Sequence, residues 1–138
     1  MLLKKLLLLV LTMAPAAAMA AEIEPGEWEF TSITTSRVLP TPQTATFRRC
    51  IRKEEAANPD RWMLDPGQGD CKLTPGAKTH DSYTWRMACS SARLVGTGSA
   101  RLTRGTMDGE TVMNGEVQGQ KFELRTKVSG KRLGPCKG

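Results

Sequence analysis

The stretch RLVGTGSARLTRGTMDGETVMNGEVQGQKFELRTKV, residues 93–128, decides the fold because three strands can be registered in it from the letters alone. Asp108-Gly109 is a two-residue hairpin signal, since both residues tolerate the positive φ of a type I′ turn. Counting outward from this turn places Leu102 opposite Gly115 and Ala100 opposite Val117. The pattern therefore predicts an antiparallel pair of strands that turns at Asp108-Gly109.

A second hairpin signal lies at Gln118-Gly119. It places Gly115 opposite Phe122 and Met113 opposite Leu124. Gly115 is then expected between two large side chains, Leu102 and Phe122, where its missing side chain makes room for both.

The two predicted registers agree on the faces of the meander. Alternation with a period of two predicts one buried face, made of Ala100, Leu102, Met113, Val117, Phe122, Leu124 and Val128. On the other face, opposite charges are expected to face one another across the strands, with Arg101, Glu116 and Lys121 in one row and Glu110 opposite Lys127 in another. In the preceding strand, Gly96 and Gly98 suggest strong bending or a bulge.

The N-terminus has the pattern of a secretory signal peptide. Lys4 and Lys5 form its positive region, Leu6 to Leu11 its apolar core, and Ala18-Met19-Ala20 a cleavage signal. We therefore expect residues 1–20 to be removed near Ala20, and residues 21–138 to form one exported, periplasmic domain. The apolar run is too short for a membrane span, and no later run is apolar enough.

The charge balance is mild once the leader is set aside. The whole chain carries 20 basic and 14 acidic residues, and Lys4 and Lys5 are lost with the leader. An exported protein of small positive charge, with no basic residues interleaved with stacking aromatics, is not expected to bind nucleic acid. We expect a monomer.

Four cysteines fall in the exported part: Cys50, Cys71, Cys89 and Cys136. An even count in an oxidising compartment predicts two disulfides, with three connectivities open. A hairpin that turns at Thr79 to Asp81 places Cys71 opposite Cys89, which leaves Cys50 for Cys136. The rival pairing, Cys50 with Cys71 and Cys89 with Cys136, stays open at this point.

The remaining segments extend the pattern of short strands. A strand begins after Pro25-Gly26, a second covers Thr44 to Ile51, and two more flank the turn at Thr79 to Asp81. The charged run that follows Cys50 predicts one short helix, which ends before Asn58-Pro59. The expected fold is all-β: a curved antiparallel sheet or a small, partly open barrel of about seven strands, with one short helix and two disulfides.

Motifs at both ends of the exported part resemble a known family. They are PGEWEF (Pro25 to Phe30), C-x-L (Cys71 to Leu73), T-W-x-x-x-C (Thr84 to Cys89) and SGKRLGPC (Ser129 to Cys136). Together with Cys50 and the charged segment after it, they are similar to the domain-of-unknown-function 3617 family over almost all of residues 22–136. The resemblance implies a small exported protein of Gram-negative bacteria. It implies no activity, ligand or catalytic residue.

No catalytic or metal site is predicted from the residues. His80, the only histidine, lies beside Asp81 at a predicted hairpin tip, where a solvated loop residue is the ordinary interpretation. The cysteines show no C-x-x-C pair, which argues against zinc or thioredoxin-like chemistry. The segment Asp65 to Asp70 lacks the ligand spacing of a calcium loop. We therefore expect no cofactor and no metal.

Two groups of residues remain as candidate binding surfaces. If Cys50 bonds Cys136, basic residues from two segments come together as a possible site for an anionic lipid headgroup, lipopolysaccharide or an acidic partner, namely Arg48, Arg49, Arg52, Lys53, Lys131 and Arg132. The apolar triplet Trp62, Met63 and Leu64 is either a cap on the sheet core or an exposed binding lip.

The sequence thus favours a small, non-catalytic binding or accessory protein of the envelope, with an apolar or anionic ligand. Two alternatives stay open. One is a protein-binding module that uses a sheet edge, and the other is a hydrolase with a carboxylate-based site, for which no residues are identified.

Overall fold

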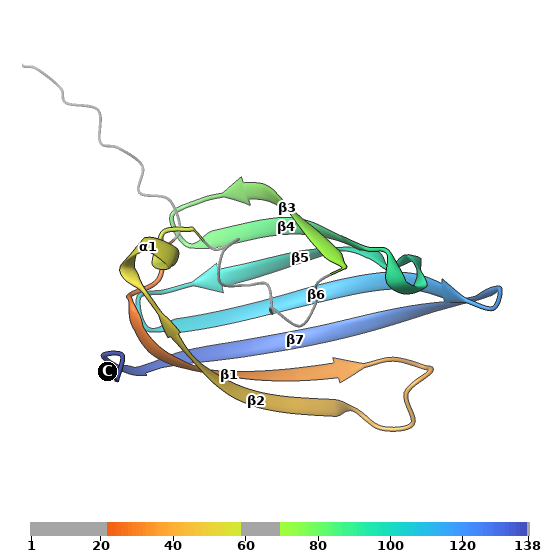
Figure 1. Ribbon diagram of the computed structural model, residues 1–138, viewed down its shortest axis with the longest axis horizontal. Helices are drawn as coiled ribbons and strands as arrows, with labels where there is room; N and C mark the ends of the chain where they lie inside the picture. Colours follow the sequence, from red (N-terminus) through yellow and green to blue (C-terminus); the bar gives the residue numbers. More distant parts are fainter. Residues whose placement is uncertain (1–21, 59–69, 138) are drawn as a thin grey trace, which may run out of the picture.

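Seven antiparallel strands form one open sheet in a computed structural model that describes residues 22–58 and 70–137. The strand order across the sheet is β2-β1-β7-β6-β5-β4-β3, so that the first strand lies next to the last (Figure 1). The strands are β1 (Gly26–Thr35), β2 (Gln43–Ile51), β3 (Cys71–Lys78), β4 (Ser82–Cys89), β5 (Val95–Leu102), β6 (Thr106–Val117) and β7 (Gln120–Gly134). The all-β prediction is confirmed, and the sheet is open because β2 and β3 do not pair with each other.

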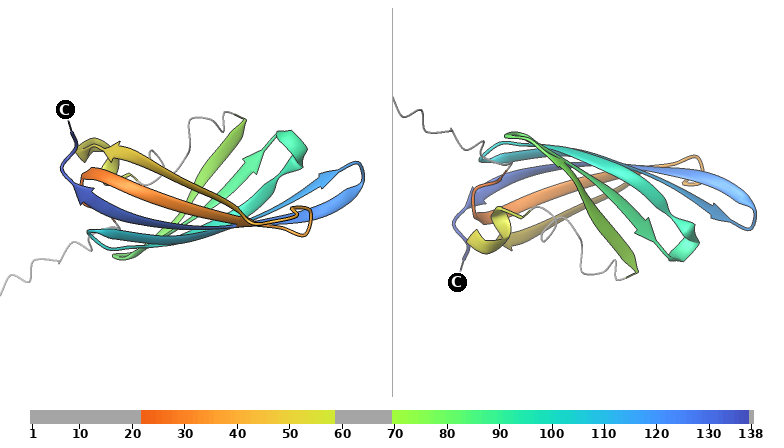
Figure 2. Two further views of the ribbon diagram at one scale, coloured as in Figure 1. Left: turned by 90° about the horizontal axis from the view of Figure 1, so that it is seen from below. Right: turned by 90° about the horizontal axis from the view of Figure 1, so that it is seen from above.

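The sheet is strongly twisted, and both of its edges curl toward the face that carries the short helix α1 (Lys53–Ala56), as the two views of Figure 2 show. The segment before β1 runs along the same end. The Ile23 amide donates to the Ala56 carbonyl at 3.5 Å, and the Glu24 amide donates to the Arg104 carbonyl at 3.0 Å. This segment therefore links α1 to the turn between β5 and β6.

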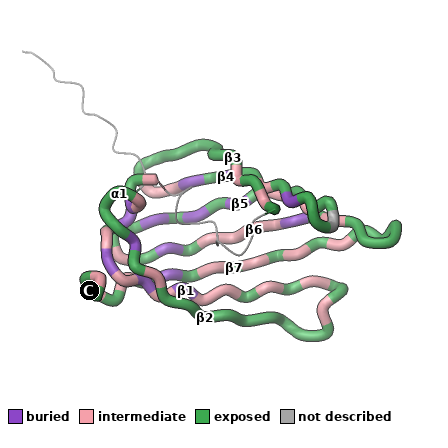
Figure 3. Tube along the Cα trace, viewed as in Figure 1, coloured by how far each residue is buried: buried purple, intermediate pink, exposed green. Residues whose placement is uncertain are grey.

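The hydrophobic core lies where the curled sheet, α1 and the N-terminal segment meet. Most of the buried positions lie toward this end of the strands (Figure 3). Trp28, Ile51 and Tyr83 are fully buried, and Ile23 and Ala56 pack in the same cluster. Because aromatic side chains bury the most apolar surface, they dominate the free energy of this core.

Glycines on the core face let aromatic rings lie flat across neighbouring strands. A Cβ at Gly98 would overlap the Trp85 ring, and a Cβ at Gly130 would lie 2.7 Å from Cδ1 of Phe30. Gly98 is the cross-strand partner of Trp85, and Gly130 is that of Phe30. Of the two alternatives expected at Gly96 and Gly98, strong bending or a bulge, the bulge is not present, because β5 pairs without interruption on both sides. These glycines instead provide space for side chains from adjacent strands.

The hairpin between β6 and β7 follows the predicted register. Gly115 lies opposite Phe122 and Met113 opposite Leu124. Gln118 and Gly119 both have positive φ, at 51° and 79°, as a two-residue turn with this twist requires.

The hairpin predicted at Asp108-Gly109 is wrong. The chain turns earlier, between Thr103 and Thr106, where the Thr103 hydroxyl accepts from the Thr106 amide at 2.9 Å and the Thr103 amide donates to the Thr106 carbonyl at 2.9 Å. Gly109 pairs within the strand with Ala100 and has no positive φ. The chain therefore turns where a threonine hydroxyl closes the turn, and not at the Asp-Gly pair.

The earlier turn changes the partners but not the faces. Leu102 lies opposite Met107, eight positions before the expected partner Gly115. Because the shift is an even number of residues, each side chain keeps its predicted side of the sheet. Gly115 consequently lies opposite Phe122 and not opposite Leu102. On the other face, Arg101 lies opposite Asp108 and not in the predicted charge row.

Two cross-strand charge pairs of that outer face are confirmed, Glu116 opposite Lys121 and Glu110 opposite Lys127. Both disulfides follow the favoured connectivity, Cys50–Cys136 and Cys71–Cys89. The second disulfide joins direct cross-strand partners, as the hairpin register predicted. The first disulfide ties the end of the edge strand β2 to the segment after β7.

The glycine at position 98 gives a direct test of the packing. Gly98→Ala is expected to lower the free energy of unfolding by about 1 to 3 kcal/mol, because the added Cβ overlaps the Trp85 ring and forces the indole to move. Gly105→Ala is the matched control, since a Cβ there has no heavy atom within 4 Å. Urea unfolding measures both, and equal stabilities of the two variants would contradict the described packing.

The two disulfides are expected to differ in their contribution to stability. Loop closure predicts about 4 to 5 kcal/mol for the 86-residue separation of Cys50–Cys136 and about 3 kcal/mol for the 18-residue separation of Cys71–Cys89. Paired Cys→Ala variants, compared by chemical unfolding, measure the difference. A larger loss on removing Cys71–Cys89 would show that native-state strain or residual unfolded structure outweighs chain entropy.

Candidate functional site

The predicted basic cluster is divided between the two faces of the sheet. The Cys50–Cys136 disulfide does bring its two segments together. Alternation along the strands, however, places Arg49 and Arg132 on the core face, each as a cross-strand partner of Trp28. Arg48 and Lys131 are both partners of Glu29 and lie on the opposite face. The six residues therefore do not form one continuous surface.

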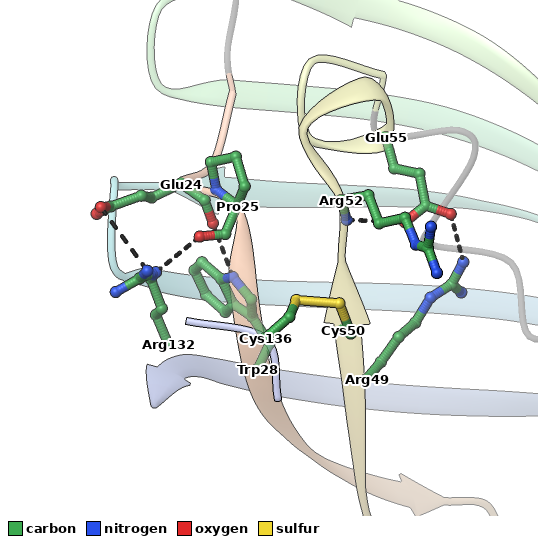
Figure 4. The surroundings of a disulfide bond; sticks show 9 residues. All are labelled: Glu24, Pro25, Trp28, Arg49, Cys50, Arg52, Glu55, Arg132 and Cys136. Carbon is green, nitrogen blue, oxygen red and sulfur yellow. Dashed lines mark hydrogen bonds and ion pairs between the residues drawn. A yellow bond between two sulfur atoms is a disulfide. The ribbon is translucent and has the colours of Figure 1, made fainter. Parts of the chain in front are cut away.

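Acidic groups within the fold already engage four of the six basic residues. Glu29 lies between Arg48 at 3.1 Å and Lys131 at 3.6 Å. Arg49 forms an ion pair with Glu55 of α1 at 3.5 Å (Figure 4). These pairs are mostly exposed, so each is worth about 1 kcal/mol or less. They lower the net positive charge that the cluster offers to an outside anion.

Arg132 has a structural role at the same end of the molecule. Its Nε donates to the Pro25 carbonyl at 2.9 Å, and its guanidinium lies 4.0 Å from the Glu24 carboxylate (Figure 4). The Trp28 indole donates to the Glu24 carbonyl at 2.9 Å. A Cβ at Gly26 would lie 2.6 Å from Nε of Arg132. Residues of the PGEWEF and SGKRLGPC motifs thus contact each other and hold the two segments together.

Among the described residues, Asp81 is the charged group next to the histidine. His80 is 82% exposed, and its Nε2 lies 3.8 Å from Asp81. The described residues contain no group of three or more histidine, cysteine, aspartate or glutamate side chains that is arranged to hold a metal ion. The turn histidine is therefore placed as expected, at a solvated hairpin tip.

The two shifted pKa values have structural causes. Hydrogen bonds from the Ser91 side chain and backbone amide lower the pKa of Asp70 below its usual value, and the amide lies 2.7 Å from the carboxylate. A hydrogen bond with Glu110 raises the pKa of Arg125, and Glu123 adds a second contact at 3.3 Å. The first pair joins β3 to the 3-10 helix η1 (Ser91–Arg93), and the second lies on the outer face. Both stabilise the fold.

A row of apolar residues crosses the core face at the end away from α1. The register places Leu124, Met113, Gly96, Met87 and Leu73 side by side on five successive strands. Met113 is buried, and the other side chains of the row are half-buried. Phe122 continues the same face along β7, two residues before Leu124. We call Leu73, Met87, Met113, Phe122 and Leu124 the apolar strip.

The apolar strip lies away from α1, whereas η1 contacts β4 and β6 at the strip's own end of the sheet. α1 lies at the opposite end of the strands (Figure 1), and in the described part of the chain the strands contact one another and η1 without a second sheet above them. Sequence reasoning did not find this row, because the wrong turn at Asp108-Gly109 separated Met113 from Gly96. A turn predicted at Thr103 to Thr106 would have placed Met113 opposite Gly96 and so completed the row.

A hollow lies beside the Phe122 end of the apolar strip. It is bounded by the β1–β2 loop, η1 and the β6–β7 hairpin. Four basic and two acidic side chains line it. Lys121 lies opposite Glu116 on the outer face, whereas Arg37 and Arg93 make no ion pair within 4 Å among the described residues. Sequence reasoning placed Lys121 in a charge row of the outer face but did not bring Arg37 and Arg93 near it, because the three residues are far apart in the chain.

The apolar triplet Trp62, Met63 and Leu64 lies outside the described residues, as does most of the segment Asp65 to Asp70. Within the described residues, none of the helices has the length and hydropathy to cross a membrane. The two disulfides indicate an oxidising, extracytoplasmic environment.

The adjacent residues Lys131 and Arg132 test the contrast between the two faces. Arg132→Gln is expected to destabilise the fold by about 1 to 3 kcal/mol, since the charge-assisted hydrogen bond to the Pro25 carbonyl is lost. Lys131→Gln removes only a 65% exposed partner of Glu29 and is expected to cost less than about 1 kcal/mol. Thermal unfolding compares the two, and equal losses would contradict a locking role for Arg132.

Comparison with known proteins gives a family but no function. A family model described as "Protein of unknown function (DUF3617)" matches residues 23–136. The matched range contains all seven strands and both disulfides. Neither the curated proteins nor the solved structures that were compared give a match.

Proposed function

Because the chain belongs to the DUF3617 family, for which no activity is described, we propose from the structure that it is a non-catalytic binding protein of the bacterial envelope. In this proposal the protein is exported to the periplasm, and it holds an amphiphilic ligand with an apolar chain and an anionic group. The observation that carries the proposal is the apolar strip, which continues the core face beyond the packed core.

The apolar strip supports the apolar half of the ligand. A sheet that buries one face is normally covered by a second layer. The described elements form no second layer over the strip, although Leu73 and Met87 pack against the core cluster beside it. Its side chains come from five strands and are half-buried, apart from the buried Met113. Methionine adapts its shape to a flexible ligand chain, because its side chain is unbranched and its thioether is polarisable. Leucine is also unbranched at Cβ. An acyl-like chain laid across the strip would bury them.

The hollow next to Phe122 supports the anionic half. Arg37 and Arg93 come from two separate segments and line this hollow, next to Lys121, which lies opposite Glu116. We expect the anionic group here and not at Arg48, Arg49 or Arg132, whose side chains have partners within the fold. A cation without an internal partner is the better candidate, since no existing ion pair must be broken.

Two further features support export and a non-enzymatic role. The leader-like N-terminus and the two disulfides fit an oxidising compartment. In the described residues the shifted pKa values belong to structural contacts, whereas a catalytic acid or base is usually shifted within a cleft.

The test is a comparison of native and denaturing mass spectrometry on the protein purified gently from the periplasm. We expect extra mass that is lost on denaturation. Leu124→Gln in the apolar strip is expected to lose this mass, because a polar group then faces the apolar chain. Val95→Gln is the matched control, since Val95 is 56% exposed on the opposite face.

Circular dichroism is expected to show that both variants keep the strand signal of the parent. A bare chain mass for the parent, or equal retention by the Leu124→Gln and Val95→Gln variants, would contradict a ligand on the apolar strip.

A further inference from the structure

The two free edges of the sheet differ in how they are protected. β3 contains Pro75, which has no backbone N–H, and its pairing with β4 shifts register between Pro75 and Lys78. Proline, bulges and lysines are the usual means by which natural proteins block an edge strand. β2 has no proline and pairs with β1 without interruption from Gly26–Ile51 to Thr34–Gln43. Only β2 therefore offers a regular edge.

The arginines of β2 do not block its edge. Arg48 reaches back over β1 to Glu29 at 3.1 Å, and Arg49 reaches α1 through Glu55 at 3.5 Å. Arg48 is therefore held over β1, and Arg49 is held against α1, so that neither side chain extends past the β2 edge. Apart from Arg49 and the buried Ile51, the residues of β2 are exposed. The outer backbone of a regular edge strand presents unpaired N–H and C=O groups.

An apolar row across the sheet ends abruptly at this edge. The row runs from β5 to β2 through Leu102, Met107, Gly130, Phe30 and Phe47. Its first four members are buried, whereas Phe47 is 49% exposed although its ring stacks on Phe30 at 5.3 Å between centroids. One further strand next to β2 would place a side chain against the open side of the Phe47 ring.

The charge around β2 indicates what such a strand carries. Between Phe30 and Lys53 the sequence contains five basic residues and no acidic one, the five being Arg37, Arg48, Arg49, Arg52 and Lys53. A second copy of β2 would bring two such segments together, which like-charge repulsion disfavours. An acidic strand would complement them, because opposite charges across an interface favour the encounter.

We propose that β2 is a strand-addition site for an extended, acidic segment of a partner protein, with an apolar side chain of that segment covering Phe47. In such β-augmentation, backbone hydrogen bonds supply affinity, and alternate side chains supply specificity. The site is separate from the apolar strip. The attraction is supplied by Arg37, Arg52 and Lys53, which flank β2 and make no ion pair within 4 Å among the described residues.

The probe is a ten-residue peptide that alternates valine with glutamate. Binding to the disulfide-bonded protein is measured by fluorescence anisotropy, and hydrogen exchange is followed on segments 43–51 and 71–78. We expect protection of residues 43–51 and none of residues 71–78, whose edge carries Pro75. A peptide with the same side chains but N-methylated at alternate residues is expected to bind at least tenfold more weakly, because it lacks the backbone donors.

Side-chain variants separate edge recognition from general attraction. Phe47→Thr keeps strand propensity and is expected to weaken binding about tenfold, whereas Ile33→Thr, at a similarly exposed position on the other face, is expected to leave it unchanged. Equal affinity for a valine-lysine peptide would overturn the charge argument. Absence of protection in residues 43–51 would overturn the proposal, as would peptide-independent dimerisation that protects β2.

Discussion

The fold depends on the antiparallel pairing of β1 with β7, which places the first strand of the described chain beside the last. Contacts between residues about a hundred positions apart are costly, because a long loop must close before they form. The Cys50–Cys136 disulfide offsets this cost by tying the neighbour of β1 to the end of β7. Arg132 adds a second tie through the Pro25 carbonyl. The insertion of β1 between β2 and β7 also creates the core, since Trp28 and Phe30 project from it.

Glycine placement converts this pairing into a curled single-layer sheet. Aromatic rings from β1 and β4 lie across Gly130 and Gly98 of the neighbouring strands. Rings that lie flat on a sheet bury large areas without a facing layer, and strands without side chains at those points twist more easily. The core is consequently filled by stacked side chains at one end, and the same face continues toward the other end as the apolar strip. The curvature of the sheet and the part of this face that the described elements leave uncovered have a common origin.

The sequence predicted the elements and faces well because these depend on local rules. Alternation, the turn at Gln118-Gly119 and the cysteine register each involve neighbouring residues, and the structure confirms the faces, the turn and the register. Val117, which alternation placed among the buried residues, is 51% exposed. The prediction of a turn at Asp108-Gly109 was wrong because the local turn preference of these two residues competed with packing in the core. Closing the turn at Thr103 to Thr106 satisfies the threonine hydroxyls and brings Leu102 against Met107 in the core. Core packing of this kind has no signature in a short window, so the apolar strip and the hollow beside Phe122 could not be predicted either.

The residues that identify the family are explained by the fold. Gly26 allows the close approach of Arg132, Trp28 is buried against the N-terminal segment, and Cys136 closes the long disulfide. A motif that is fully engaged in structure does not report a reaction. In such a protein, function is expected on surfaces that the motif residues support but do not form. The apolar strip, which includes Leu124, and the β2 edge, which includes Phe47, are two such surfaces. Those surfaces use ordinary side chains, and a frame of this kind can present different ligands or partners on them.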